Sequence, residues 1–351
     1  MANFNTRIKH LSQGVEHKLR QVLEVNFLIV LPGFLLSGLI ACLSLIVYRQ
    51  SFLHFLNPLL IAAISGIIIG NTVRIPRLYQ PGIKFSMKRI LRLSVILLGL
   101  KLSISEVLTL GGTGLIIIIL SSISTFYLTC WLGQRFRINH KLTHLIAAGT
   151  SICGASAIIA TNAVIDGTEE DNTYAIALIT GLGTMAMVFY PMIPNLLHLS
   201  PQVFGLWCGA SIHEVAQVVA AAFQHSAVSG ELATISKLSR VLLIIPVITL
   251  LGYQQRKTRF GVDGLLSSVP WFVLAFMLMI VVNNLSLIPG TFKSSILSWN
   301  ELLLCVSMAA MGLETKFKKL SRIGLTPLFL AISSWLFLSF ISLSLIRFAA
   351  F

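Results

Sequence analysis

The sequence predicts an all-α fold, a polytopic helical membrane bundle of about ten or eleven transmembrane segments with internal repeats and two broken helices. Of its 351 residues, 56% are hydrophobic and only 11% are charged, whereas a soluble domain carries about 25% charged residues. The apolar residues form blocks, such as 112–133, that are long enough to cross a hydrocarbon core about 30 Å thick. Such blocks satisfy their backbone polar groups in lipid as helices, because barrel strands would alternate polar and apolar residues. A water-soluble fold is therefore excluded.

Eleven apolar segments follow a polar stretch of mixed charge at residues 1–26. The first segment is too long for the apolar core of a signal peptide, so we expect the protein to retain it as a span. The predicted segments are 27–48, 56–73, 93–108, 112–133, 141–165, 171–194, 201–225, 233–254, 268–286, 297–313 and 323–346. Whether 201–225 crosses completely is left open. We expect residues 1–26 to be cytoplasmic and residues 27–351 to form one transmembrane domain.

Basic residues are concentrated in alternate loops. If all eleven segments cross and the N-terminus lies inside, twenty of the 26 Lys and Arg residues fall on the cytoplasmic side and three on the outer side. Loops rich in Lys and Arg stay in the cytoplasm, so this arrangement and a cytoplasmic N-terminus are expected. The net charge of +14 therefore reflects topology and does not indicate a nucleic-acid partner.

The sequence shows no set of residues typical of an enzyme. The five cysteines all lie in apolar blocks, and their odd number argues against a disulfide framework or a metal site. No Walker loop, zinc-spaced His/Cys set, nucleophile elbow or dinucleotide fingerprint is found. We therefore expect neither an enzyme nor a cofactor.

Two internal similarities are present. At an offset of 213, Gly99-Leu100 and Gly111 match Gly312-Leu313 and Gly324. At an offset of 55, Cys153-Gly154-Ala155-Ser156 matches Cys208-Gly209-Ala210-Ser211, and Asn162 then pairs with Gln217. Repeats of this kind are typical of secondary transporters, although small residues also recur by chance in packed spans. With eleven crossings the first repeat is inverted and the second is parallel, which requires either a permuted duplication or a miscounted segment.

The two Cys-Gly-Ala-Ser motifs predict breaks in the segments 141–165 and 201–225. Clustered Gly and Ser weaken a helix, and a break at mid-membrane depth is tolerated only inside protein or along a cavity. The half-helix after each break would present free N–H groups to a ligand. The alternative is that the small residues only allow close helix packing. The candidate substrate-binding residues are Thr150, Ser151, Gly154, Ser156, Asn162, Gly209, Ser211, Gln217 and Arg240.

His213 and Glu214 lie just beyond the second motif, after Ile212. An ionisable residue deep in a span costs about 2.5–3.5 kcal/mol on insertion scales, which makes it a functional candidate. We expect the pair to serve proton or ion coupling, although a carboxylate at a helix N-terminus can also be purely stabilising. Lys237 is expected to extend to the interface, as long basic side chains near helix ends do, while Arg240 could bind an anion.

The runs at 149–158 (Gly-Thr-Ser-Ile-Cys-Gly-Ala-Ser-Ala-Ile), 204–214 (Phe-Gly-Leu-Trp-Cys-Gly-Ala-Ser-Ile-His-Glu) and 98–102 (Leu-Gly-Leu-Lys-Leu) resemble the YeiH-type family of bacterial membrane proteins. That family is labelled as sulfate exporters, and the resemblance implies the bacterial inner (plasma) membrane and a sulfate-like solute. More distantly, the order of spans is similar to the bile-acid–sodium symporter superfamily. By that analogy Thr150, Ser151, Ser156, Ser211, His213 and Glu214 would line the crossing of two broken helices. The two broken spans lie closer together in this sequence than in that superfamily.

Together these features predict a secondary transporter that exports a small anion by alternating access around the two breaks, so that residues 27–351 would form a transporter domain. The expected partners are a small anionic solute, the lipid bilayer, a coupled proton or cation, and a second copy of the chain in a homo-oligomer. The alternative is a non-transporting membrane scaffold or sensor subunit, in which both helices would run unbroken.

Overall fold

The computed structural model describes residues 27–50, 57–102, 104–254, 271–315 and 324–349. This described part of the chain is built from helices, and six of them are long and apolar enough to cross a membrane. The predicted class, a polytopic helical membrane bundle, is confirmed. In chain order the elements are α2 (Phe27–Gln50), α3 (Pro58–Thr72), η1 (Arg77–Tyr79), α4 (Gln80–Phe85), η2 (Ser86–Ile90), α5 (Leu91–Leu98), η3 (Gly99–Lys101), α6 (Ile104–Arg135), α7 (His140–Ala148), η4 (Gly149–Cys153), α8 (Ala155–Ile165), α9 (Glu169–Phe189), η5 (Tyr190–Met192), α10 (Ile193–Leu197), α11 (Pro201–Ser211), α12 (Val215–His225), α13 (Ala227–Val241), α14 (Ile244–Gln254), α16 (Trp271–Asn284), α17 (Gly290–Glu314) and α19 (Leu325–Phe348).

The third predicted segment, 93–108, has the wrong boundaries. The helical run from η1 to η3 covers 77–101, and the next crossing begins at Gly111, where a φ of 58° bends α6. The basic residues Lys88 and Arg89 suggested a loop, yet they lie on this run with exposed side chains. Both residues lie near the middle of the run, and Lys88 is close enough to Glu214 to act on its carboxylate electrostatically.

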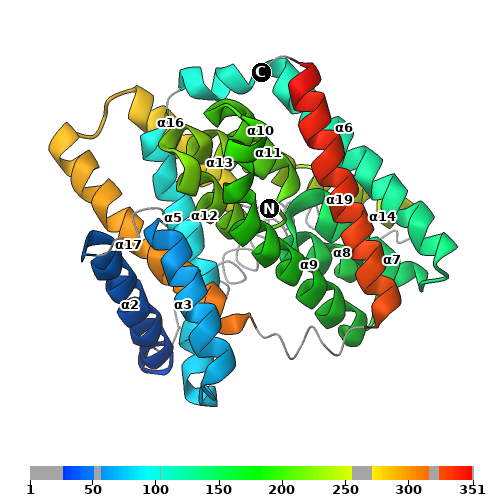
Figure 1. Ribbon diagram of the computed structural model, residues 1–351, viewed down its shortest axis with the longest axis horizontal. Helices are drawn as coiled ribbons and strands as arrows, with labels where there is room; N and C mark the ends of the chain where they lie inside the picture. The colour runs from blue at the N-terminus through cyan, green and yellow to red at the C-terminus, as the bar shows by residue number, and fades with distance from the viewer. Residues whose placement is uncertain (1–26, 51–56, 103, 255–270, 316–323, 350–351) are drawn as a thin grey trace, which may run out of the picture.

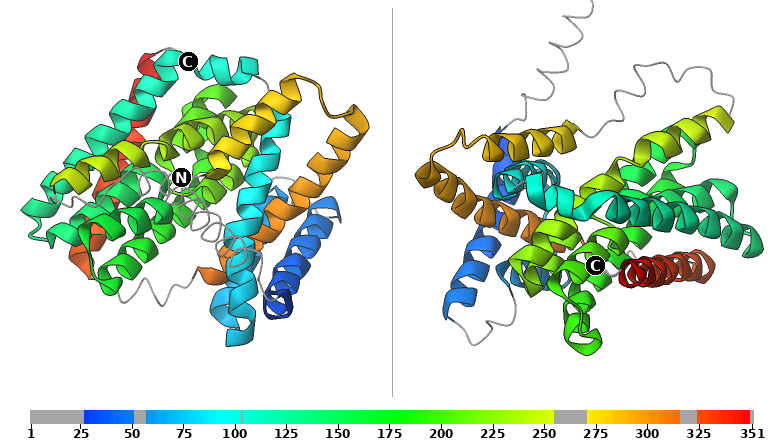
Figure 2. Two further views of the ribbon diagram at one scale, coloured as in Figure 1. Left: turned by 180° about the vertical axis from the view of Figure 1, so that it is seen from behind. Right: turned by 90° about the horizontal axis from the view of Figure 1, so that it is seen from above.

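The helices pack into two groups, which Figures 1 and 2 show beside each other. The first bundle contains α2 to α5 with α16 and α17, and the second contains α6 to α14 with α19. Within the first bundle, α3 and α17 approach closely through glycine. A Cβ atom added to Gly66 would lie 2.4 Å from the Ala309 carbonyl oxygen, and one added to Gly312 would lie 2.3 Å from that of Ala63.

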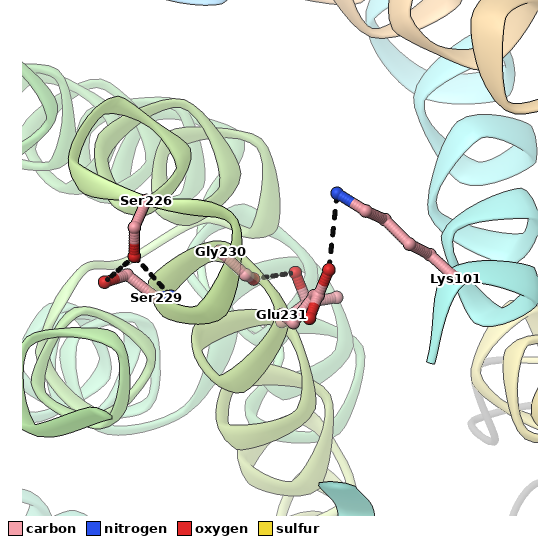
Figure 3. A network of polar contacts seen from close by, with 6 residues as sticks. Lys101, Ser226, Ser229, Gly230 and Glu231 are labelled. Atoms are coloured by element: carbon pink, nitrogen blue, oxygen red, sulfur yellow. Dashed lines mark hydrogen bonds and ion pairs between the residues drawn. The ribbon is translucent and has the colours of Figure 1, made fainter. Parts of the chain in front are cut away.

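Polar contacts join the two bundles near the start of α3 and the end of η3. Figure 3 shows Lys101 of η3 extending towards Glu231 of α13, with Nζ 3.3 Å from Oε1. The Lys101 ammonium also lies 5.0 Å from the centre of the Phe223 ring on α12. At the start of α3, the Asn57 side chain donates to the Ala220 carbonyl oxygen at 3.4 Å. Arg135, the last residue of α6, lies at the other end of the molecule from these contacts. We call the end that contains Arg135 the basic end.

The segment 140–165 is a helical hairpin that enters and leaves at the basic end. Lys141, at its start, donates from Nζ to the carbonyl oxygen of Asp166 just beyond its end, at 2.8 Å. Between them α7 packs against α8, and a Cβ atom on Gly149 would lie 2.8 Å from the Ile158 side chain. We call this segment the first hairpin.

The segment 201–225 turns back in the same way and forms the second hairpin. Its arm α11 runs parallel to α13, because Gly205 lies against Ser229 and Gly209 against Ala233. Its arm α12 joins α13 through Ser226 alone and runs antiparallel to it. The rings of Phe204 and His225, near the two ends of the hairpin, are 5.2 Å apart.

The direction of α9 relative to α19 shows that the second hairpin does not cross. Three hydrogen bonds join α9 and the adjoining α10 to α19 in increasing order along both segments. They are Tyr174 to the Gly324 carbonyl at 3.2 Å, Tyr190 to Ser339 at 2.9 Å, and Arg347 to the Leu197 carbonyl at 2.7 Å. The two segments are therefore parallel, whereas eleven crossings would make them antiparallel. The expectation that 141–165 crosses is wrong, and the open question about 201–225 is answered by a second hairpin. Besides the two hairpins, the helices of the described part of the chain form nine segments.

This topology resolves the conflict between the two repeats. The offset of 213 relates α3, the η1–η3 run and α6 to α16, α17 and α19, and the contacts of α3 with α17 and of α5 with α16 are equivalent under it. The hairpins then correspond to each other, as do α9 and the α13–α14 pair, and every pair is inverted. The duplication is thus permuted along the chain, and a segment was also miscounted. The connections at 166–168 and 198–200 contain neither Lys nor Arg, so the two hairpins move no basic residue to the other side. Lys84, Lys88, Arg89 and Arg92, however, lie on the helical run and no longer count as loop residues.

Candidate functional site

The tip of the first hairpin is formed by η4, a single π-helical turn, and by Gly154. Gly154 has φ 71° and ψ −133°, a conformation that residues with a Cβ atom rarely adopt. Here the predicted break and the Cys-Gly-Ala-Ser motif coincide. In the second hairpin the motif is the last turn of regular helix α11, and the chain turns at Ile212, His213 and Glu214. The offset of 55 therefore does not superpose the two tips, and Asn162 is not the counterpart of Gln217.

Glu214 lies between the two tips. Its carboxylate accepts a hydrogen bond from Thr180 of α9 at 2.9 Å and one from the backbone N–H of Ala155 at the start of α8. It also caps α12 in a reciprocal arrangement with Gln217, whose side chain accepts from the Glu214 N–H at 3.2 Å. The amide nitrogen of Gln217 donates to the Thr180 carbonyl at 3.0 Å. One carboxylate thus occupies the N-terminal ends of both returning arms.

Lys237 and Arg240, on α13, lie on the opposite side of the tips and are completely buried, at 0% exposure. Lys237 Nζ donates to the carbonyl oxygens of Ile152 at 3.0 Å and Ile212 at 2.8 Å. Arg240 donates to those of Ser151 at 2.8 Å and Ala210 at 2.7 Å, and also to Thr150. The expectation that Lys237 extends to the interface is wrong. Its position inside the bundle puts the interface out of reach, and two helix ends supply its acceptors.

Several buried polar atoms at the tips have no hydrogen-bond partner among the described residues. They are both ring nitrogens of His213 and the hydroxyl of Thr150. The rings of His213 and Trp335 are 6.3 Å apart. Tyr190 stacks on Trp207, with ring centres 4.2 Å apart, and continues this aromatic cluster towards Trp335. Buried polar groups are nearly always bonded, so these atoms are candidates to face a ligand. Seven further unpartnered atoms lie on η2, α6, α7, α8, α9 and α17, away from the two turns.

The other candidate residues are distributed unevenly. The hydroxyls of Ser151 and Ser211 bond to carbonyl oxygens of their own helices, at 2.7 Å and 2.6 Å, and Gly209 provides close packing against α13. Ser156 is exposed on α8, and Asn162 lies away from the tip beside Gly167. The structure therefore brings Thr150, Gly154, His213, Glu214, Gln217 and Arg240 together at the tips, but gives Ser156 and Asn162 no contact there.

Sequence reasoning missed Thr180, Tyr190, Trp207, Lys237 and Trp335. For Lys237 the available signal was a lysine within an apolar segment, but its side chain was predicted to extend to the interface. The aromatic residues carried no signal, because Trp and Tyr in an apolar segment are equally typical of an interfacial belt.

Comparisons with known proteins agree with this architecture. A family model described as "Conserved hypothetical protein 698" matches residues 32–331. A UPF0324 membrane protein of Yersinia pestis is 35% identical over 324 residues, which is 88% of this chain and 90% of that protein. The chain belongs to this family. The UPF0324 inner membrane protein YeiH of Salmonella typhi is 35% identical over 80% of this chain and 83% of its own length. A family member from Corynebacterium glutamicum is 34% identical over 89% of this chain and 91% of its own length. The resemblance to YeiH-type proteins is confirmed, and so is the prediction that the chain is a multi-pass membrane protein.

Proposed function

We propose that this protein is a secondary transporter that moves a small anion by alternating access, with the solute held where the two hairpin tips meet. The observation that carries the proposal is the inverted pair of hairpins, one entering from each end, whose tips both contact Lys237. Irregular backbone inside a membrane bundle occurs where it lines a path, and inverted repeats are the architecture of many secondary transporters. The basic loops place the N-terminus in the cytoplasm under the same proposal.

The chemistry of the tips favours a small anion. Two buried cations, Lys237 and Arg240, face one carboxylate, Glu214, so the tips carry an excess of positive charge when all three are ionised. The unpartnered hydroxyl of Thr150 is a donor suited to an anionic oxygen. The family label of sulfate exporter fits this chemistry. Export of sulfate remains part of the proposal.

Glu214 is the proposed coupling residue, with His213 as its partner. The carboxylate is partly exposed and lies at the junction of both hairpins with α9, so its protonation would change contacts on both tips at once. An ionised carboxylate repels an anionic solute. If Glu214 takes up a proton when the solute binds, that repulsion is removed. Coupling to a proton therefore suits this site better than binding of a bare anion beside an ionised Glu214.

Flux of radiolabelled sulfate from proteoliposomes, with and without a pH gradient, tests the proposal. We expect the wild-type protein to carry sulfate, or a competing oxyanion or carboxylate, and Glu214→Gln to lose the dependence on the gradient. The matched control is Glu301→Gln, which changes an exposed carboxylate on α17 and should transport normally. If neither sulfate, sulfite, thiosulfate nor carboxylates move or shift the thermal unfolding of the purified protein, the scaffold or sensor alternative is favoured.

A further inference from the structure

Lys237 adds positive charge to the proposed solute site, but its hydrogen bonds are made to the backbone of the hairpins. It is completely buried on α13, and two of the three hydrogens on its ammonium group go to carbonyl oxygens. One acceptor, Ile152, belongs to the first hairpin, and the other, Ile212, belongs to the second. A single side chain therefore joins the two hairpins, which come from different parts of the chain.

Arg240, one turn further along α13, makes the same connection with more bonds. Its guanidinium donates to the carbonyl oxygens of Thr150 and Ser151 in the first hairpin. It also donates to that of Ala210 in the second hairpin at 2.7 Å, and more weakly to that of Ile212 at 3.4 Å. The planar fork of arginine suits such a set of acceptors, because its donors point in fixed directions.

These acceptors are the last carbonyl groups of the two inward-running arms. The final carbonyls of a helix have no partner within it and carry about half a negative charge. In water they would be solvated, but at the tips they are buried inside the bundle. Two cations at the negative ends of two helices are therefore balanced by those ends, and each helix end is satisfied by a cation.

We propose that Lys237 and Arg240 are positioning residues that clamp the two hairpin tips together and so fix the distance across the solute site. That this distance matters for a solute rests on the proposed function. The contacts of the clamp themselves do not depend on a solute. The clamp assigns Arg240 to the carbonyl ends of both hairpins, and leaves the anion to the unpartnered groups of Thr150 and His213.

Hydrogen exchange of the purified full-length protein, followed by mass spectrometry without any solute, tests the clamp. In Lys237→Met we expect amides of 152–156 and of 212–216 to exchange about tenfold faster, because both carbonyl ends lose a buried donor. Amides of α3 and α17 in the first bundle should be unaffected. Lys237→Arg keeps the charge and the donors, so both tips should stay closer to wild type.

Ser236→Ala is the matched control, because this buried hydroxyl contacts only the second hairpin, through the Leu206 carbonyl at 3.4 Å. It should leave residues 152–156 unchanged. An increase confined to one hairpin in Lys237→Met, or equal exchange at both tips in Lys237→Met and wild type, would overturn the clamp. If Lys237→Met loosens the whole fold, Lys237→Arg decides: faster exchange at both tips together supports the clamp, as does wild-type protection of both, and faster exchange at one tip alone overturns it. Absence of flux in a protein with coupled tips would count against the transport proposal alone.

Discussion

Gly154 shows how one residue determines the geometry of the site. Its positive φ turns the chain between η4 and α8, and a Cβ atom there would lie 2.8 Å from Cγ of Glu214. The turn and the carboxylate therefore occupy adjacent space. The sequence identified both residues, because glycine at a break and an acid in an apolar segment are local signals.

Gly154→Ala should destabilise the protein by about 1–3 kcal/mol, since strain at a glycine-only backbone conformation adds to the clash with Glu214. The matched control is Gly38→Ala on α2, where an added Cβ atom would have no neighbour within 4 Å. That change should be neutral or stabilising by up to about 1 kcal/mol, because alanine is the better helix former. Thermal unfolding in detergent measures both, and equal midpoints for the two variants would contradict the assignment.

Lys237 marks the limit of prediction at this scale. A lysine in an apolar segment gives no local sign of its partners, and its acceptors lie 85 and 25 residues away along the chain. Backbone carbonyls are present at every residue, so nothing in the sequence distinguishes those that become helix ends at the same point. Site residues that break a helix could be predicted from the sequence. Those that donate hydrogen bonds to the carbonyl end of a helix could not.

At the scale of elements, the sequence could not distinguish a hairpin from a crossing. The return arms α8 and α12 each have 11 residues, about 16 Å of helix, so two such arms have the apolar length of one span. Their hydropathy is the same in either arrangement. Only the packing of α7 on α8 and the direction of α9 relative to α19 separate the two.

Labelling with a membrane-impermeant maleimide tests the topology in a background without reactive cysteines. His140→Cys and Glu170→Cys, which flank the first hairpin at exposed positions, should react from the same side of the membrane. Gln202→Cys and Val228→Cys, which flank the second hairpin, should both react from the other side. With eleven crossings, the members of each pair would instead react from opposite sides.

At the scale of the molecule, two bundles meet through few polar contacts in the described part of the chain. The Lys101–Glu231 pair is partly exposed, with side-chain exposures of 37% and 15%, so it contributes at most about 1 kcal/mol. A weak contact of this kind can form and break during a cycle in which one bundle moves against the other. The bundles themselves could be predicted only as one set of helices, because the permuted repeat separates partners such as α3 and α17 along the chain.

Charge exchange tests whether this pair joins the bundles. Lys101→Glu and Glu231→Lys should each lower the thermal midpoint, because like charges then face each other between η3 and α13. The double exchange should recover most of the loss, with a coupling energy of about 0.5–1 kcal/mol in a double-mutant cycle. Simple addition of the two losses would show that the residues do not interact.

The clamp also constrains the order in which the chain can be assembled in the membrane. The Ile152 carbonyl is synthesised 85 residues before Lys237, its donor. At about 5–20 residues per second, the ribosome needs several seconds to make the interval. During that time the first hairpin has carbonyl ends that lipid cannot satisfy. We therefore expect the first hairpin to insert fully only after α13 has been made.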